Sequence, residues 1–505
     1  MEFLSFELYL AGIHFFSNPL IYIYLFLGTM IGIIFGSLPG LTSTMALAVF
    51  VPFTFGLDPI LSFAFLLAIY MSSVYGGSIS AILINIPGTP SAVATAMDGY
   101  PLCQKGRAGE AIGVATVSSA LGGLISVFFL AVMAPVIADF ALEFSAQEYV
   151  GLALLGISVI AMISSTSMIK GLITGIIGLF IGSIGLDTIT GYPRFVFSMP
   201  ELFDGLSLIP VMIGMFGLTE IFEQIANQQH LSIIPQKLAG LLPPLSEFLR
   251  LKWSLLRASI VGVIIGAIPA TGGSVAAVVS YALEKRFSKR GHLFGTGIID
   301  GVAVPETANN ATVGGALVPM LTLGIPGDPM TAVLIGALIM HGLRPGPLLF
   351  TQQMPFVSSI FISLFLSVAF MLVIGLVGAR YFAKLITIPK SFLIPAILLF
   401  CLIGSYAINN SIFDVGILIV SGIIGFVLKK FGFPVQPIIL GLILGPIFEE
   451  NLRRSMILSD GNWSTFITRP ISLVLFIIVA FVLFAPYVLS FIKNRYLHLV
   501  KLIKG

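Results

Sequence analysis

The stretch NIPGTP at residues 85–90 recurs as GIPGDP at residues 324–329, and both copies stand inside long apolar stretches. An earlier pair, GSLPG at 36–40 and GAIPATG at 266–272, precedes them in the same order. Proline removes a backbone donor and glycine permits turns, so together they break a helix. Broken backbone at membrane depth is tolerated only where protein buries it or where it lines a wet cavity. The four stretches therefore predict a protein built around interrupted helices.

The composition around these breaks is that of a membrane protein. The chain has 505 residues, of which 57% are hydrophobic and only 9% are charged, whereas soluble domains carry about 25% charged residues. The uncharged runs include 111–138, 149–169, 258–283, 354–379, 391–413 and 471–492. Since a helix needs about 20 apolar residues to cross the hydrocarbon core, we expect an all-α polytopic protein with about 10–14 hydrophobic helical elements, some not crossing fully.

The repeated order of the breaks indicates an internal duplication. The charged stretch 284–290 is the candidate for an insertion in the second copy. We expect four regions: a first membrane repeat over 1–225, a polar and cytoplasmic linker over 226–256, a second membrane repeat over 257–450, and a C-terminal transmembrane helix with a basic tail over 451–505.

Basic residues predict the orientation of the repeats, because Lys and Arg concentrate in cytoplasmic loops. Both flanks of 258–283 are basic, which favours a re-entrant hairpin with its tip near Pro269 and both ends in the cytoplasm. The corresponding stretch of the first copy has no basic flank, since no Lys or Arg occurs before Lys105, so both of its ends look external. The two copies then form an inverted repeat. The basic tail is expected inside, and Arg344 is a lone basic residue left outside.

The breaks and the polar residues near them form the candidate site. Unwound helix ends offer free N–H groups to anions and free C=O groups to cations, while Asn, Ser and Thr add donors and oxygen ligands. The candidates for substrate binding are Pro39, Gly40, Thr42, Ser78, Asn85, Gly88, Thr89, Pro269, Thr271, Gly272, Asn309, Asn310, Pro326 and Gly327. The candidates for cation coupling are Asp328, Glu306, Thr322 and Asn310. The coupling ion is expected to be Na⁺ or H⁺, with no other cofactor.

Structural explanations stand beside these functional ones. Isolated glycines such as Gly122 and Gly123 serve close packing between membrane helices, and single Asn or Thr residues bond neighbouring helices. Glu306 and Asp328 are ionisable residues in otherwise uncharged stretches, and such residues mark functional paths because burying an acid is costly. Asp328 could equally cap a helix that follows it.

Signals for other function classes are missing. The sequence has no H-E-x-x-H, G-x-S-x-G or P-loop motif, so an enzyme is not expected. The five histidines are scattered, and Cys103 and Cys401 match no metal spacing. A net charge of +3 is too small to indicate a nucleic-acid partner.

The longer motifs around the breaks resemble the large membrane subunit of the tripartite tricarboxylate transporters. The resemblance rests on 36–40 leading into 52–55, 75–79 leading into 85–89, 98–101, 105–109, 305–311, 323–327 and 341–347. This chain departs from the family pattern at three positions: Ala270 stands where Gly is usual, Asp328 where Ser is usual, and Asp300 where Glu is frequent. An acid at 328 would repel an anionic substrate if it pointed into the site.

The resemblance implies a transporter subunit of the bacterial inner membrane that takes up di- or tricarboxylates on a cation gradient without ATP hydrolysis. It also implies two partners, a small four-helix membrane subunit and a periplasmic solute-binding protein, and hairpins like those of elevator-type carriers. A homodimer of the membrane complex is left open. The alternatives are a stand-alone carrier or channel that needs no binding protein and, more remotely, an intramembrane enzyme.

Overall fold

The structure is a computed structural model that describes residues 10–163, 167–187, 189–226, 240–241, 245–269, 271–386 and 388–484. The described residues are helical apart from one small hairpin of two strands, β1 (Gly185–Leu186) and β2 (Pro193–Arg194), which confirms the predicted all-helical class. Among them, seven helices are long and apolar enough to cross a membrane, and five shorter apolar helices accompany these.

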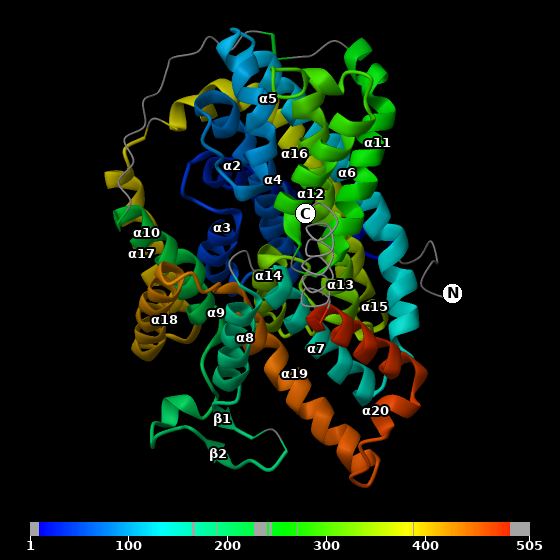
Figure 1. Ribbon diagram of the computed structural model, residues 1–505. Coiled ribbons are helices and arrows are strands. Elements are labelled where there is room, and N and C mark those ends of the chain that lie inside the picture. Colours follow the sequence, from blue (N-terminus) through cyan, green and yellow to red (C-terminus); the bar gives the residue numbers. More distant parts are fainter. Residues whose placement is uncertain are drawn as a thin grey trace, which may run out of the picture. The chain divides into compact units, whose positions relative to one another are not determined.

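The chain forms two compact units (Figure 1). Unit 1 holds residues 1–142 and 207–427, and unit 2 holds 143–206 and 428–505, as far as they are described. The helices of unit 1, including nearly all of the last, are α2 (Pro19–Ser37), α3 (Ser43–Phe50), α4 (Pro59–Ile84), α5 (Val93–Gln104), α6 (Ala108–Ala141), α9 (Leu208–Met212), α10 (Thr219–Ala226), α11 (Leu245–Ala267), α12 (Gly272–Phe287), α13 (Asp300–Leu323), α14 (Pro329–Met340), α15 (Leu348–Gln352), α16 (Met354–Leu385), α17 (Lys390–Asn409) and α18 (Ile412–Lys430). Its short helical turns are η2 (Ile13–Ser17), η3 (Val51–Thr54), η4 (Pro90–Ala92), η6 (Ile213–Leu218) and η7 (Gly291–Leu293).

Glycines determine how the first broken helices pack. A side chain at Gly28 would overlap Phe65 of α4, and one at Gly36 would overlap Ser73 further along α4. The contacts advance in step along both helices, so α2 and α4 run parallel at the short distance that small residues permit. The chain reverses after α2, and α3 and η3 lead back to the start of α4. Helices α2 and α3 are therefore a helical hairpin.

The second broken helices pack in the same way. Side chains at Gly262 and Gly266 of α11 would overlap Ala308 and Thr312 of α13, so α11 and α13 also run parallel. The chain turns back after α11, and α12 leads toward the start of α13. Helices α11 and α12 form the second hairpin.

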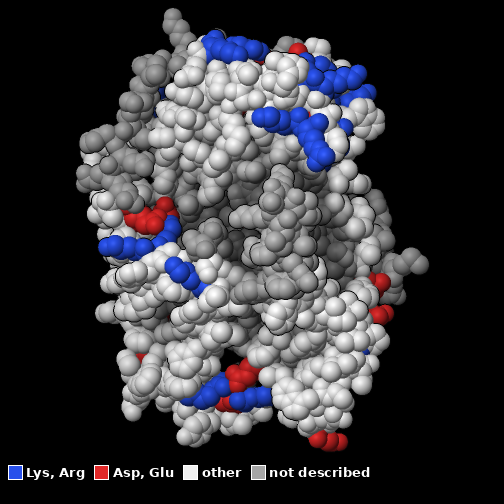
Figure 2. All heavy atoms as spheres, viewed as in Figure 1, with Lys and Arg blue, Asp and Glu red and all other residues white. Residues whose placement is uncertain are grey.

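The two hairpins enter unit 1 from opposite ends. At one end, Arg257 of α11 forms an ion pair with Glu284 of α12 at 2.8 Å, and Arg250 pairs with Asp300 at the start of α13 at 3.0 Å. Figure 2 shows Lys and Arg gathered there, over α5 and α11, and we name it the basic end. The first hairpin ends at the other end, where η3 lies beside the C-terminus of α14 and Thr54 Oγ1 is 3.5 Å from His341 Nε2.

Unit 2 contains α7 (Ala146–Ile163), α8 (Met168–Gly182), the hairpin, η5 (Pro200–Leu202), α19 (Gln436–Leu458), α20 (Thr465–Thr468) and an apolar helix over Pro470–Phe484. Helix α19 packs on α7 and α8. Its Arg453 reaches the hairpin and donates to Asp187 at 2.5 Å. Bonds from the backbone of Thr190 and Ile189 and from Arg453 hold the pKa of the Asp187 carboxyl well below its usual range. This ion pair attaches the hairpin formed by β1 and β2 to α19.

One helix begins inside the stretch predicted as the linker. Helix α11 begins at Leu245, so the last part of the predicted linker 226–256 is helical and continuous with the hairpin. Its first turns carry charges and remain helical because they extend an amphipathic helix beyond the apolar stretch. Residues 227–239 and 242–244 of that linker, and residues 485–505 of the predicted last helix and tail, lie outside the described residues.

Candidate functional site

Four interruptions of the helices in unit 1 lie where the sequence predicts them. We name them break 1 (residues 38–42, between α2 and α3), break 2 (85–89, between α4 and η4), break 3 (268–271, between α11 and α12) and break 4 (324–328, between α13 and α14). Ala270 of break 3 is outside the described residues.

Break 2 packs through glycines on the end of α2, immediately before break 1. A side chain at Gly88 would overlap the carbonyl oxygen of Gly36 and would come within 2.8 Å of Ser80 Oγ. A side chain at Gly77 of α4 would overlap Thr89. The Gly88 N–H donates to the Gly77 carbonyl at 3.2 Å, which folds break 2 back on α4.

Breaks 3 and 4 touch in the same manner. A Cβ atom at Gly327 would lie 2.6 Å from Ala316 Cα and 2.8 Å from the Gly266 carbonyl oxygen. A Cβ atom at Gly272, whose φ of +63° favours glycine, would lie 4.0 Å from Asp328 Cβ. Break 4 is therefore packed on the hairpin tip that contains break 3.

The two pairs of breaks are joined to each other on both sides. On one side η4 packs on α12, and a Cβ atom at Gly273 would lie 3.4 Å from Ser91 Cβ. On the other side α14 packs on α3, and Thr44 Oγ1 lies 3.3 Å from Met330 Sδ. The four breaks thus form a closed ring inside unit 1, which we name the polar centre.

Two buried asparagines of α13 adjoin the polar centre. Asn309 Nδ2 donates to the Val74 carbonyl at 3.3 Å, and Asn310 Nδ2 donates to the Met71 carbonyl at 3.1 Å. Among the described residues, neither Oδ1 atom has a hydrogen-bond partner, although both side chains are fully buried. The Oδ1 of Asn309 faces Gly273 at the start of α12. Buried polar atoms are normally bonded, so these two oxygens need a partner that the described residues do not supply.

Asp328 is the N-cap of α14. Its Oδ1 accepts from the Thr331 N–H at 2.8 Å, and the Thr331 hydroxyl completes a capping box. Its Oδ2 accepts from the Tyr70 hydroxyl of α4 at 2.5 Å. The side chain is 3% exposed. The capping explanation of Asp328 therefore applies in this structure, and the carboxylate also ties α14 to α4.

Glu306 lies one turn before the two asparagines. It is fully buried, and its carboxylate accepts from the hydroxyls of Thr95 of α5 and Ser119 of α6. An ionised carboxylate with only hydroxyl partners is costly to bury. Glu306 is therefore a candidate to hold a proton or to neutralise a cation.

The other predicted residues have local roles in the breaks. Thr42 caps α3 by accepting from the Met45 N–H at 3.1 Å, and Thr322 donates to the Val318 carbonyl at 2.8 Å. Ser78 donates to the Tyr75 carbonyl, and Thr271 donates to the Ile268 carbonyl. Pro39, Gly40 and Pro269 are partly buried in their breaks, whereas Pro326 is fully buried.

Asn85 differs from the other candidates. It ends α4 with a left-handed φ of 57°, which asparagine tolerates, and its side chain is exposed. The structure therefore assigns it a backbone role in break 2.

Five residues around the polar centre were not predicted: Tyr70, Ser91, Thr95, Ser119 and Thr331. Thr331 has a local signal, because a residue three positions after an N-cap completes a capping box. Tyr70, Thr95 and Ser119 have none, since their partners are more than 180 residues away in the chain. Among the described residues, no three His, Cys, Asp or Glu side chains gather as a metal site.

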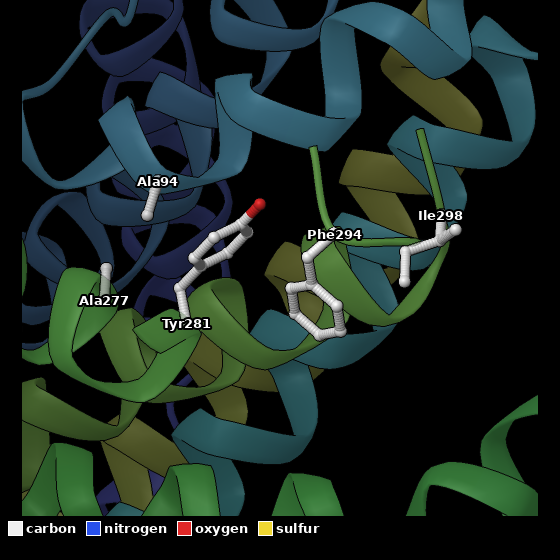
Figure 3. Packing of buried hydrophobic residues seen from close by; sticks show 5 residues of the cluster. All are labelled: Ala94, Ala277, Tyr281, Phe294 and Ile298. Atoms are coloured by element: carbon white, nitrogen blue, oxygen red, sulfur yellow. The ribbon is translucent and has the colours of Figure 1, made fainter. Parts of the chain in front are cut away.

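Asp98 of α5 attaches the second hairpin to the first half of unit 1. Its carboxylate accepts from the backbone N–H groups of Gly295, Gly297 and Ile298 at 2.7–3.1 Å and from the Tyr281 hydroxyl at 2.8 Å. Figure 3 shows the Tyr281 ring beside Phe294, with the hydroxyl pointing toward α5, which carries Ala94. Asp98 is fully buried, so these bonds fix α12 against α5 near the basic end.

Comparison with known proteins agrees with this architecture. The model of the tripartite tricarboxylate transporter TctA family matches residues 22–440. A relative from Agrobacterium vitis, described as an uncharacterised 52.8 kDa protein in the TAR-I ttuC' 3' region, is 38% identical over 455 residues, which cover 90% of this chain and 91% of the relative. A second protein of that organism, from the TAR-II ttuC' 3' region, is 43% identical over 211 residues, which cover 42% of this chain and 87% of the relative. No solved structure matches.

The family match includes all four breaks and both asparagines, and the first relative aligns with nearly the whole chain. The chain is a transporter subunit and not an enzyme. It belongs to the TctA family, the large membrane subunits of the tripartite tricarboxylate transporters.

Proposed function

We propose that the polar centre is the substrate site of this subunit, and that the subunit takes up small di- or tricarboxylates on a cation gradient. The observation that carries this proposal is the closed ring of four breaks, which collects helix ends from both halves of unit 1. Free N–H groups at helix starts favour a carboxylate, and the serine and threonine hydroxyls beside them add donors.

The two halves of unit 1 are proposed to be inverted repeats. The parallel pairs α2–α4 and α11–α13 and the hairpins at opposite ends support this. The positive-inside rule would place the basic end, the linker and the C-terminus in the cytoplasm. We also propose transport by an elevator-like movement of the hairpins and their partner helices, and the same arrangement supports it.

The coupling ion is proposed to be Na⁺ or H⁺. The unpartnered Oδ1 of Asn310 supports a cation nearby, and Glu306 offers a buried carboxylate. Thr322 and Asp328 remain candidates, although the oxygens of Asp328 already accept from Tyr70 and Thr331.

The proposed partners rest on the family to which the chain belongs. We propose a small four-helix membrane subunit and a periplasmic solute-binding protein, in the inner membrane of a bacterium, with a homodimer of the membrane complex left open. The alternative is a stand-alone carrier. Uptake that needs neither partner in proteoliposomes would favour this alternative.

Asn309→Ala should lower carboxylate uptake into proteoliposomes about tenfold, because its free oxygen can accept from or coordinate a cation bound with the substrate, and a contact to a charged group is worth about 1.5–3 kcal/mol. Initial rates at several substrate concentrations measure this. The control is Asn462→Ala, an exposed asparagine of unit 2, which should leave the rate unchanged. Equal rates for wild type and Asn309→Ala would remove this residue from the site, and no carboxylate uptake by the complete wild-type complex would contradict the proposed function.

A further inference from the structure

The helix N-termini around the polar centre differ in whether a side chain caps them. Two have side-chain caps: Thr42 caps α3, and Asp328 caps α14. The start of α12 has no such cap, because the Thr271 hydroxyl points back to the Ile268 carbonyl at 2.8 Å. Break 2 lies beside this start, because η4 packs on α12.

A second observation indicates a ligand at the start of α12. The fully buried Asn309 presents its unpartnered Oδ1 to Gly273 in the first turn of α12. Thr312 Oγ1 would lie 3.3 Å from a Cβ atom at Gly273. The uncapped N–H groups of α12 and the Thr312 hydroxyl favour an anion, and the Asn309 oxygen is an acceptor for a cation bound beside it.

The start of α14, in contrast, is already capped by a carboxyl group. Both oxygens of Asp328 accept hydrogen bonds, from Tyr70 and from Thr331. The corresponding position of break 2, in the same Pro-Gly-x-Pro context, is Thr89, which carries no ionisable group. Asp328 Cβ lies 4.0 Å from the position of a Cβ atom at Gly272, so this side chain adjoins the start of α12.

We propose that Asp328 is a selectivity residue whose carboxylate occupies the α14 side of the polar centre, so that this transporter binds dicarboxylates and discriminates against tricarboxylates. The inference rests on the proposed function and names the substrate class within it. A further substrate carboxylate directed toward α14 would meet a like charge in a buried environment, where the repulsion is strong. Such a repulsive group is a common route to specificity.

Two probes isolate the effect of one carboxylate. Glutarate and tricarballylate share the same carbon backbone and differ only by a central carboxylate. Calorimetric titration of the purified full chain at fixed Na⁺ and pH 8 gives a Kd for each. Wild type should bind glutarate at least tenfold more tightly than tricarballylate. In Asp328→Asn and Asp328→Ser, which keep good N-cap residues, the ratio of the two constants should fall at least tenfold.

A matched control is Asp58→Asn. Asp58 is also an N-cap aspartate, accepting from the Ile60 N–H at 2.8 Å, but it caps α4 at the end opposite the basic end. This variant should keep the wild-type ratio.

Several outcomes would overturn the inference. One is an unchanged ratio in both Asp328 variants when they melt close to wild type, and another is equal wild-type affinity for the two probes. An unchanged ratio with lost Na⁺ dependence would assign Asp328 to cation coupling instead. If folded wild type binds neither probe and the complete complex transports no carboxylate, the proposed function itself fails, which is a distinguishable result.

Discussion

The Gly88→Ala protein is expected to lose carboxylate uptake and to be destabilised by about 3 kcal/mol, the upper part of the range for overpacking a core. The added Cβ would overlap the carbonyl oxygen of Gly36 and crowd Ser80 Oγ. The obstacle is mostly backbone, which cannot move aside as the end of a flexible side chain can. Breaks 1 and 2 would have to separate, and the polar centre would open on that side.

Uptake in proteoliposomes and the melting temperature in detergent measure this effect. The matched control is Gly416→Ala in α18, where a new Cβ would meet nothing within 4 Å. That substitution should be neutral, or stabilising by up to about 1 kcal/mol, because alanine is the better helix former. Wild-type uptake by Gly88→Ala would show that breaks 1 and 2 are not in contact in the working protein.

The Asp98→Ala protein is expected to lose roughly 4 kcal/mol of stability. The substitution leaves three N–H groups, of which those of Gly297 and Ile298 are buried, and the Tyr281 hydroxyl without their acceptor, and each lost bond to a charged group is worth about 1.5–3 kcal/mol before relaxation. The second hairpin would then lose its buried polar attachment to α5. Unfolding of the protein in mixed micelles by rising SDS gives the change in free energy.

Tyr281→Phe is the internal control for this effect. It removes one of the bonds to Asp98 and keeps the ring packed against Phe294, so it should cost only about 1.5 kcal/mol, the lower end of the range for a bond to a charged group. Equal losses for the two variants would mean that the backbone bonds from residues 295–298 contribute little. Asp98 would then be a minor contact and not the attachment of the second hairpin.

The sequence predicts the helical class and the positions of the breaks because these follow from local chemistry. Proline and glycine interrupt a helix wherever they stand, and an uncharged run of twenty residues has few alternatives to a membrane helix. Gly36–Gly40 and its later counterpart are interrupted as expected. Arg257 of α11 and Glu284 of α12 form an ion pair. The second hairpin therefore has both of its ends at the same end of unit 1, as the basic flanks of this stretch predict.

The partners of the site residues could not be predicted in this way. Tyr70 meets Asp328 across 258 positions, and Ser119 meets Glu306 across 187. Such pairs depend on how α4, α6 and α13 cross, which hydrophobic patterns of fully buried helices do not specify. The amide of Asn85 led us to expect its side chain in the site. Its left-handed backbone instead makes it the residue that ends α4, and its side chain is exposed.

If the four helix breaks form one polar centre where a carboxylate binds, a cryo-electron microscopy structure of the full complex with glutarate should show it. We expect ligand density between Ser91, the first turn of α12 and Asn309, within contact distance of at least two breaks. Breaks that lie apart from one another, or glutarate bound away from all four of them, would contradict it.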